Sequence, residues 1–125
     1  MRMAEDRHRA DCVFCGIVAG EVPATKVHED ELVVAFRDLL PKAPTHVLLI
    51  PRKHVPSLNA LSAEDDAMIG HLVRVAARVA AAEGCGDRGY RLVANCGREG
   101  GQSVDHVHFH LVGGRPLGWP PWPSG

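Results

Sequence analysis

The stretch His106-Val107-His108-Phe109-His110 alternates histidines with apolar residues. In an extended strand, successive side chains point to opposite faces, so the three imidazoles share one face while Val107 and Phe109 enter a core. The pattern predicts a strand over residues 105–112. Its histidines suit a metal site, because imidazole is a common zinc ligand, or nucleophilic attack on phosphorus by a neutral ring nitrogen. A third interpretation, histidines on an exposed sheet face, is disfavoured by the glycine-rich loop beside them.

That loop leads directly into the histidine strand and has the sequence GREGGQS at residues 97–103. Glycines let backbone N–H groups turn toward an anion without obstruction by a Cβ. Gln102 and Ser103 add side-chain donors, and Asn95 adds an amide just upstream. The loop matches neither the P-loop nor the dinucleotide-binding fingerprint. Its position beside the histidines is what predicts a phosphate site.

The remaining chain predicts two helices and four more strands. Ser62 and Asp65 form a capping-box-like start for a helix over residues 62–83, which buries one apolar face and leaves His71 on the other. A short N-terminal helix is expected over residues 12–19. The expected fold class is α+β, an antiparallel sheet of about five strands with the long helix against it. β-branched and aromatic residues indicate the other strands at residues 26–28, 32–36, 46–50 and 90–94.

Bulk composition restricts the classes of function. The chain has 125 residues, enough for one domain, and a net charge of -1, which argues against a nucleic-acid partner or a polybasic membrane patch. Its apolar runs are too short to span a bilayer, and residues 1–10 lack the apolar stretch of a signal peptide. We expect a cytoplasmic protein with a disordered lead-in at residues 1–10, and one domain with a C-terminal tail at residues 11–125.

Several motifs occur together across nearly the whole chain. GGQSV at residues 100–104 precedes the histidine strand, and the tail contains GGR at 113–115 and WPP at 119–121. In this combination the chain resembles the histidine triad (HIT) superfamily over about residues 11–121. The tail resembles the branch of histidine triad nucleotide-binding proteins, the purine nucleoside phosphoramidases. Motifs that recur upstream in the same order are ED at 29–30, AFRD at 35–38, APTH at 43–46 and IPRKH at 50–54.

The resemblance implies a HIT fold, a homodimer with a sheet continuous across its subunits, and an AMP-like or GMP-like ligand. It implies hydrolysis of a phosphoramidate P–N bond at the α-phosphate, through a covalent nucleotidyl-histidine and with no cofactor required for the chemistry. His108 corresponds to the family nucleophile, and we expect a backbone carbonyl to fix its tautomer. The implied catalytic residues are His108, His110, His46 and Ser103.

The resemblance also assigns residues to the nucleotide. Asp38 would hold the ribose hydroxyls, because an ionised carboxylate is a double acceptor for a cis-diol. Trp119 would reach the site of the partner subunit. Ser103 and His46 are candidates to protonate the leaving amine. The implied nucleotide-binding residues are Asp38, Leu39, Phe36, Phe14, Ile17, Asn95, Gly101, Gln102, Ser103, Val104 and Trp119.

Cys12 and Cys15 form a Cys-x-x-Cys pair in a chain without a secretion signal, which favours metal or redox chemistry over a structural disulfide. With His54 and His106 the pair would complete a tetrahedral Cys₂His₂ zinc site. Zinc-bearing relatives in the superfamily have histidines at comparable positions, whereas several members of the nucleotide-binding branch lack the cysteines. We expect a structural zinc that fastens the N-terminal segment to the sheet. The alternative is two free or buried thiols.

Other functions use the same residues. Asp105 precedes the triad where the nucleotide-binding branch commonly has an aromatic residue, which leaves the substrate preference open. The same nucleophile would serve a dinucleoside polyphosphate hydrolase or a nucleotidyl transferase, and a nucleotide-binding regulatory protein with little catalysis is a further alternative. A zinc hydrolase is disfavoured because two thiolates and two imidazoles fill all four coordination positions.

Overall fold

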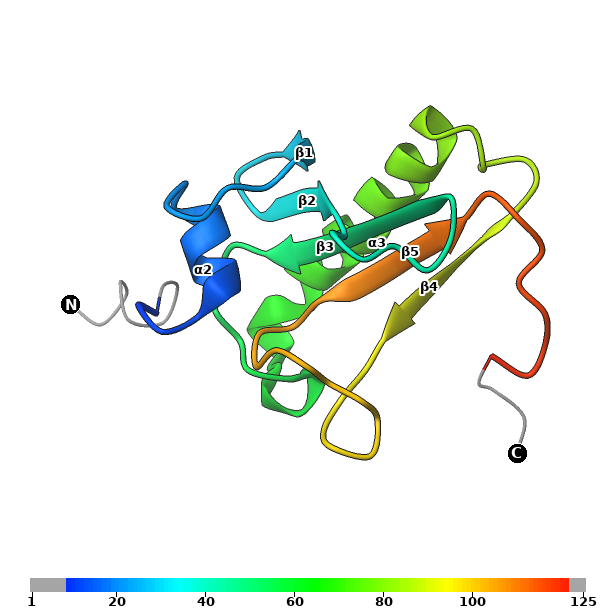
Figure 1. Ribbon diagram of the computed structural model, residues 1–125. Helices are drawn as coiled ribbons and strands as arrows, with labels where there is room; N and C mark the ends of the chain where they lie inside the picture. Colours follow the sequence, from blue (N-terminus) through cyan, green and yellow to red (C-terminus); the bar gives the residue numbers. More distant parts are fainter. Residues whose placement is uncertain (1–8, 122–125) are drawn as a thin grey trace.

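The computed structural model describes residues 9–121. It contains a five-stranded antiparallel sheet with the order β1-β2-β3-β5-β4, which confirms the predicted α+β fold (Figure 1). The expected disordered lead-in lies outside the described residues except for Arg9 and Ala10. The strands are β1 (Lys26–Glu29), β2 (Val33–Arg37), β3 (Thr45–Pro51), β4 (Tyr90–Ala94) and β5 (Phe109–Gly113).

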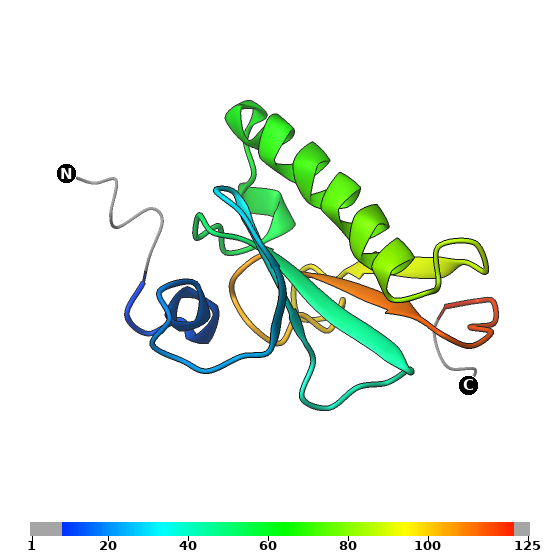
Figure 2. The same cartoon turned by 90° about the horizontal axis from the view of Figure 1, so that it is seen from above.

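A long helix, α3 (Asp66–Ala82), covers one face of the sheet (Figure 2). It is preceded by two short 3₁₀ turns, Leu58–Ala60 and Ala63–Asp65, and the predicted capping box between Ser62 and Asp65 is present. The apolar side of α3 is buried on the sheet, because its spacing puts one residue in three or four toward the core. Within the described residues, no helix is long and apolar enough to cross a membrane.

The opposite face of the sheet is covered by α2 (Val13–Val18), the predicted N-terminal helix. Phe14 and Ile17 of α2 pack in one apolar cluster with Val34, Phe36 and Ile50. The alternate residues of β2 and β3 pack on the α3 side instead. Both strands are therefore almost wholly buried, and α2 packs on the sheet face opposite α3.

The predicted strand over residues 105–112 is wrong at its start, because β5 begins only at Phe109. The last β3–β5 ladder pair is Leu49 with Phe109, and before it the N–H of Val107 donates to the carbonyl of Val55 at 2.8 Å. The residues just before Phe109 therefore pair with the segment that follows β3 and lie outside the β3–β5 ladder. The alternation persists, since Val107 packs with Met68 on the α3 side.

The β1–β2 turn is fastened to α3 through Asp30. Its Oδ2 accepts from His28 Nε2 and His71 Nε2 at 2.7 Å each, and its Oδ1 accepts from the amides of Leu32 and Val33. Burial alone would raise the pKa of this carboxyl, but the hydrogen bonds from the two histidines and the two amides outweigh it. They hold the pKa of Asp30 well below its usual range.

We expect Asp30→Asn to lower the melting temperature at pH 7 and to flatten its decline in acid. A carboxylate with a depressed pKa stabilises the fold above its unfolded pKa of about 4, and this stabilisation is lost as the pH falls toward the folded pKa. Thermal unfolding followed by circular dichroism between pH 3 and 7 tests this, with the exposed Asp87→Asn as the control. Equal acid slopes for Asp30→Asn and wild type would contradict it.

Candidate active site and metal centre

His108 is held in one tautomer by the main chain. Its side chain is 4% exposed, and its Nδ1 lies 2.8 Å from the carbonyl oxygen of His106. A carbonyl only accepts, so Nδ1 carries the proton and the Nε2 of the neutral ring keeps its lone pair. The ring of Phe14 meets His108 edge-on, with centroids 5.1 Å apart. The expected backbone carbonyl is therefore present, and Nε2 is the atom available for attack.

A second chain of contacts fixes His46 and His110. The N–H of Lys42 donates to His46 Nδ1 at 3.0 Å, so the proton of the neutral His46 ring stands on Nε2. His46 Nε2 lies 2.9 Å from His110 Nδ1 and 3.4 Å from Asp38 Oδ2. His46 thus donates to His110, whose own proton then stands on Nε2. The two triad members differ, since His108 presents a lone pair and His110 presents an N–H.

Burial keeps this pair uncharged. Removal from water, together with the neighbouring His108 and His46, lowers the pKa of His110 to about 4. Burial also lowers the pKa of His46, although Asp38 opposes the shift. Near neutral pH both rings are therefore neutral, and each can make one donor and one acceptor contact.

A cavity of about 250 Å³ lies between α2, the end of β2 and Leu48 in the middle of β3. Its walls are mainly apolar, and the rings of Phe14 and Phe36 meet edge-to-face with centroids 5.6 Å apart. Asp38 and the 90% exposed Leu39 lie at its margin. Five residues assigned to the nucleotide by resemblance therefore share this one cavity, namely Phe14, Ile17, Phe36, Asp38 and Leu39.

The loop between β4 and β5 is held by Gln102. Its Oε1 accepts from the Gly97 amide at 3.0 Å, and its Nε2 donates to the carbonyls of Pro56 and Val104 at 2.7 and 2.9 Å. The side chain shapes the loop in this structure, and its direct contact with phosphate stays a prediction. Gly101 has a φ of 80°, which glycine adopts without strain.

Two further predicted residues can be placed from the strands and the tail. Asn95 directly follows Ala94, which pairs with Phe109 at the end of the β4–β5 ladder, and its contact with a ligand stays a prediction. Trp119 is 80% exposed in the tail and lines neither cavity of the histidine face. Its assignment to the site of a partner subunit stays a prediction.

Cys12, Cys15, His54 and His106 form the predicted metal cluster, with their ligand atoms all within 4.8 Å of one another. His106 Nδ1 lies 3.4 Å from Cys12 Sγ and 3.7 Å from Cys15 Sγ, and His54 Nδ1 lies 3.3 Å from Cys15 Sγ. Nitrogen and sulfur ligands of a tetrahedral zinc ion stand about 3.5 Å apart, from bond lengths of about 2.0 and 2.3 Å. The four side chains therefore fit this ion.

The surroundings of the cluster support the same conclusion. His106 is fully buried, and its Nε2–H donates to the carbonyl of Pro51 at 2.9 Å, so the lone pair of Nδ1 faces the sulfurs. Such a carbonyl partner is typical of metal-bound imidazoles. Burial raises the pKa of Cys15 to about 11 and lowers that of His106 to about 4. A neighbouring cation would reverse the first effect by stabilising the thiolate.

Asp38, His46 and His110 also place their ligand atoms within 4.8 Å of one another. A metal on His46 Nε2 would need the proton of that ring on Nδ1, but Nδ1 already accepts from the Lys42 amide. The hydrogen bonds therefore favour the Cys₂His₂ cluster as the metal site and leave the second group for polar contacts with a substrate.

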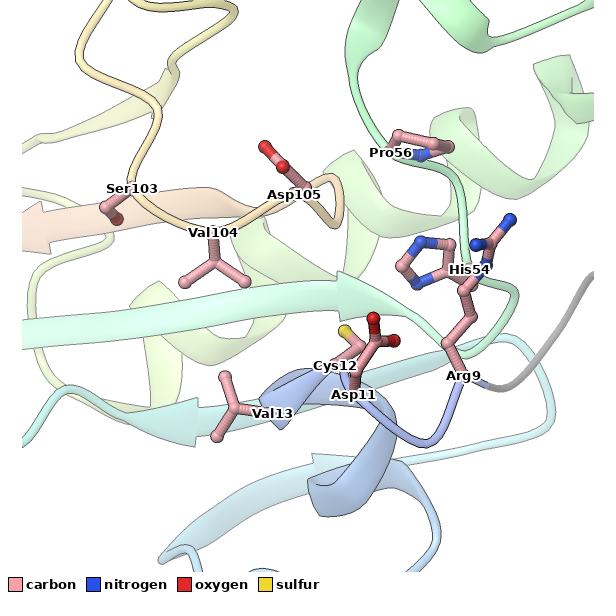
Figure 3. Close-up of a pocket in the computed structure, with 9 residues that line it drawn as sticks. All are labelled: Arg9, Asp11, Cys12, Val13, His54, Pro56, Ser103, Val104 and Asp105. Carbon is pink, nitrogen blue, oxygen red and sulfur yellow. The ribbon is translucent and has the colours of Figure 1, made fainter.

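A second cavity, of about 460 Å³, opens beside the metal cluster (Figure 3). Cys12 and His54 line it, as do Ser103 and Asp105 of the loop before the triad. Val13 lines both this cavity and the apolar one, so the two adjoin across a single side chain.

Sequence reasoning predicted a carbonyl partner for His108 but missed the main-chain groups that assign the tautomers of His46 and His106. The Lys42 amide and the Pro51 carbonyl are the clearest examples. Every residue offers a carbonyl and every residue but proline an amide, so no side-chain pattern marks them. The Lys42 amide reaches His46 through the loop before β3, whereas the Pro51 carbonyl reaches His106, 55 residues away, only in the fold.

Comparisons with known proteins agree with this geometry. The HIT domain model matches residues 19–117. A purine nucleoside phosphoramidase of Escherichia coli is 48% identical over 108 residues, covering 86% of this chain and 91% of that protein. A HIT-like protein of Synechocystis is 52% identical over 111 residues, with 89% and 96% covered. A crystal structure of a HIT family hydrolase from Legionella pneumophila superposes with a TM-score of 0.88 at 47% identity, covering 90% of this chain and all of that one. The chain therefore belongs to the HIT domain family.

Proposed function

We propose that this chain is a hydrolase that cleaves the P–N bond of purine nucleoside 5′-phosphoramidates and releases AMP or GMP. The observation that carries the proposal is the tautomer of His108, whose Nε2 lone pair is kept available by the His106 carbonyl. The similarity to the E. coli purine nucleoside phosphoramidase supports the same substrate class.

The reaction has two steps in this proposal. The Nε2 of His108 attacks the α-phosphorus, the P–N bond breaks, and the amine leaves with a proton. Water then attacks the nucleotidyl-histidine, the new P–N bond breaks, and the mononucleotide is released. The covalent intermediate replaces one difficult displacement with two easier ones.

The surrounding donors stabilise the phosphoryl oxygens. His110 offers its Nε2–H because its Nδ1 accepts from His46. Amides of the glycine-rich loop and the Ser103 hydroxyl supply further donors, which act where negative charge accumulates in the transition state. Since the Nε2–H of His46 faces His110, Ser103 is the better candidate to protonate the leaving amine.

The apolar cavity takes the purine, and Asp38 at its margin takes the ribose hydroxyls. We further propose that the protein is a cytoplasmic homodimer. Its sheet would continue across the edge strand β4, and Trp119 would reach the site of the partner subunit. Zinc on the Cys₂His₂ cluster would be structural, since four protein ligands leave no position for water.

Asp38→Asn is expected to raise the KM for an adenosine phosphoramidate by about ten- to a hundredfold, with a smaller change in kcat. A charged acceptor is worth about 1.5–3 kcal/mol in such a contact, and asparagine keeps the Oδ1 that accepts from the Leu40 amide. Steady-state kinetics with ribo- and 2′,3′-dideoxyadenosine substrates measures the effect. If Asp38 does not hold the hydroxyls, the change from the ribo- to the dideoxy substrate will lower kcat/KM by the same factor in wild type and variant.

Parallel assays of adenosine 5′-phosphoramidate and a diadenosine polyphosphate test the substrate class. We expect kcat/KM to be higher for the phosphoramidate by at least about a hundredfold, or roughly 3 kcal/mol in transition-state free energy. A preference for the polyphosphate would replace the proposal with a dinucleoside polyphosphate hydrolase. Tight AMP binding with turnover of neither substrate would indicate a regulatory nucleotide-binding protein.

A further inference from the structure

Helix α2 belongs to both the metal cluster and the apolar cavity. Cys12 is its N-cap and Cys15 lies in its first turn, while Phe14 between them lines the cavity. The Phe14 ring also meets the rings of His106 and His108 edge-on, with centroids 5.9 and 5.1 Å away. Any change in how the two cysteines are held therefore moves a wall of the cavity and a neighbour of the proposed nucleophile.

The two cysteines can form a disulfide without refolding of the helix. Residues three apart on a helix have Cα atoms about 5 Å apart, inside the range that disulfides require. Both thiols are free, the Cys15 amide donates to Cys12 Sγ at 3.3 Å, and the two sulfurs lie within 4.8 Å. A rotation of side chains is enough to bring them together.

The two cysteines differ in their exposure to a small oxidant, which suits an oxidation in two steps. Cys12 is half-buried and lines the second cavity beside His54, so a small oxidant can reach it (Figure 3). Cys15 is fully buried and contacts no such opening among the cavities described. Oxidation by a hydroperoxide would begin at Cys12, and Cys15 would then form the disulfide with it.

We propose that Cys12 and Cys15 are a modification site for hydroperoxides, and that their oxidation lowers the affinity of the apolar cavity for a nucleotide. The Cys12 sulfur attacks the O–O bond of hydrogen peroxide, giving a sulfenic acid and one water. The Cys15 thiol then displaces that hydroxyl, giving the disulfide and a second water. Two thiols lose two hydrogens and two electrons, and one peroxide becomes two waters.

Oxidation would loosen the attachment of α2 to the sheet. A disulfide removes both thiolate ligands, so any metal is left with His54 and His106 alone, and α2 loses its link to those histidines. We expect the dissociation constant for AMP to rise by about tenfold, the effect of weakening one apolar wall. This inference rests on the proposed function, because it takes the apolar cavity as the nucleotide site.

The test compares the zinc-loaded protein before and after treatment with hydrogen peroxide, and again after dithiothreitol and zinc. Mass spectrometry of peptides reports the Cys12–Cys15 disulfide, a chromophoric chelator reports released zinc, and calorimetry reports the affinity for AMP. We expect disulfide, zinc release and weaker AMP binding to appear together and to reverse together. Circular dichroism shows whether the oxidised protein stays folded.

Two variants separate this site from other oxidation. Cys12→Asp keeps an N-cap and a zinc ligand but cannot form the disulfide, so its AMP affinity should resist peroxide. Cys96→Ser removes a half-buried thiol outside the cluster and should respond as wild type does. A disulfide with unchanged AMP affinity, or no Cys12–Cys15 disulfide at all, would overturn the inference. Absence of AMP binding in the untreated protein would instead overturn the proposed function.

Discussion

His108→Ala is expected to reduce turnover of an adenosine phosphoramidate by about 10,000-fold or more, the scale seen when an enzyme loses its nucleophile. Because Nδ1 of His108 donates to the His106 carbonyl, the Nε2 of the same ring keeps the lone pair that is proposed to attack phosphorus. The affinity for AMP should change by less than about threefold, since the proposed purine and ribose contacts lie on Phe14, Phe36 and Asp38, which line the apolar cavity. Single-turnover kinetics and calorimetry measure the two quantities.

His71→Ala is the matched control, because it removes an imidazole that contacts Asp30 and lies outside both cavities of the histidine face. It should keep turnover within about threefold of wild type at a temperature where both are folded. Substantial turnover by His108→Ala, or an equal loss in both variants, would reject His108 as the nucleophile.

Removal of the proposed structural zinc is expected to destabilise the protein while leaving its chemistry in place. A structural zinc site contributes on the order of 10 kcal/mol, so a chelator should lower the melting temperature by about 10 °C or more. At saturating substrate kcat should persist, because in the proposed mechanism His108 attacks phosphorus and no metal-bound water is needed. The KM should rise, since α2 carries part of the cavity.

Cys15→Ser should bind no stoichiometric zinc and should melt at the same temperature with or without the chelator. Cys96→Ser should behave as wild type does. The opposite pattern, loss of kcat on chelation with an unchanged melting temperature, would make the metal catalytic and the phosphoramidase mechanism wrong.

The parts of the fold that sequence predicts well are local. The capping box at Ser62 and Asp65 depends on residues three apart, and the apolar face of α3 depends on spacing within one helix. The start of β5 is different, because it depends on where β3 stops offering a partner. The alternation of histidines over residues 106–110 is present as predicted, but only its second half is in the ladder.

The roles of the three triad histidines likewise depend partly on local sequence and partly on the fold. Their side chains are identical, and the period of two predicts one shared face. Their hydrogen-bond partners separate them, since His106 donates to the Pro51 carbonyl, His108 donates to the His106 carbonyl, and His110 accepts from the side chain of His46. The motif resemblance assigned these roles from sequence, whereas their physical cause is visible only in the fold.

His71 illustrates what helical periodicity leaves out. Its position predicts the exposed side of α3, and the residue is indeed partly exposed. It nevertheless donates to Asp30, 41 residues away, in an arrangement that the pattern of one helix does not contain. Long-range polar pairs of this kind require the packing of the β1–β2 turn on α3.

The most direct measurement traps the covalent intermediate. Wild-type protein mixed with excess adenosine 5′-phosphoramidate, quenched within one turnover and digested at mildly alkaline pH, should yield one peptide that carries an adenylyl group on His108. The digestion is kept alkaline because the phosphoramidate bond to histidine is labile in acid. Modification of His108 in wild type and its absence in His108→Ala are the predicted result. Turnover with no adenylylated peptide at any quench time, or adenylylation at another residue, would contradict the central claim.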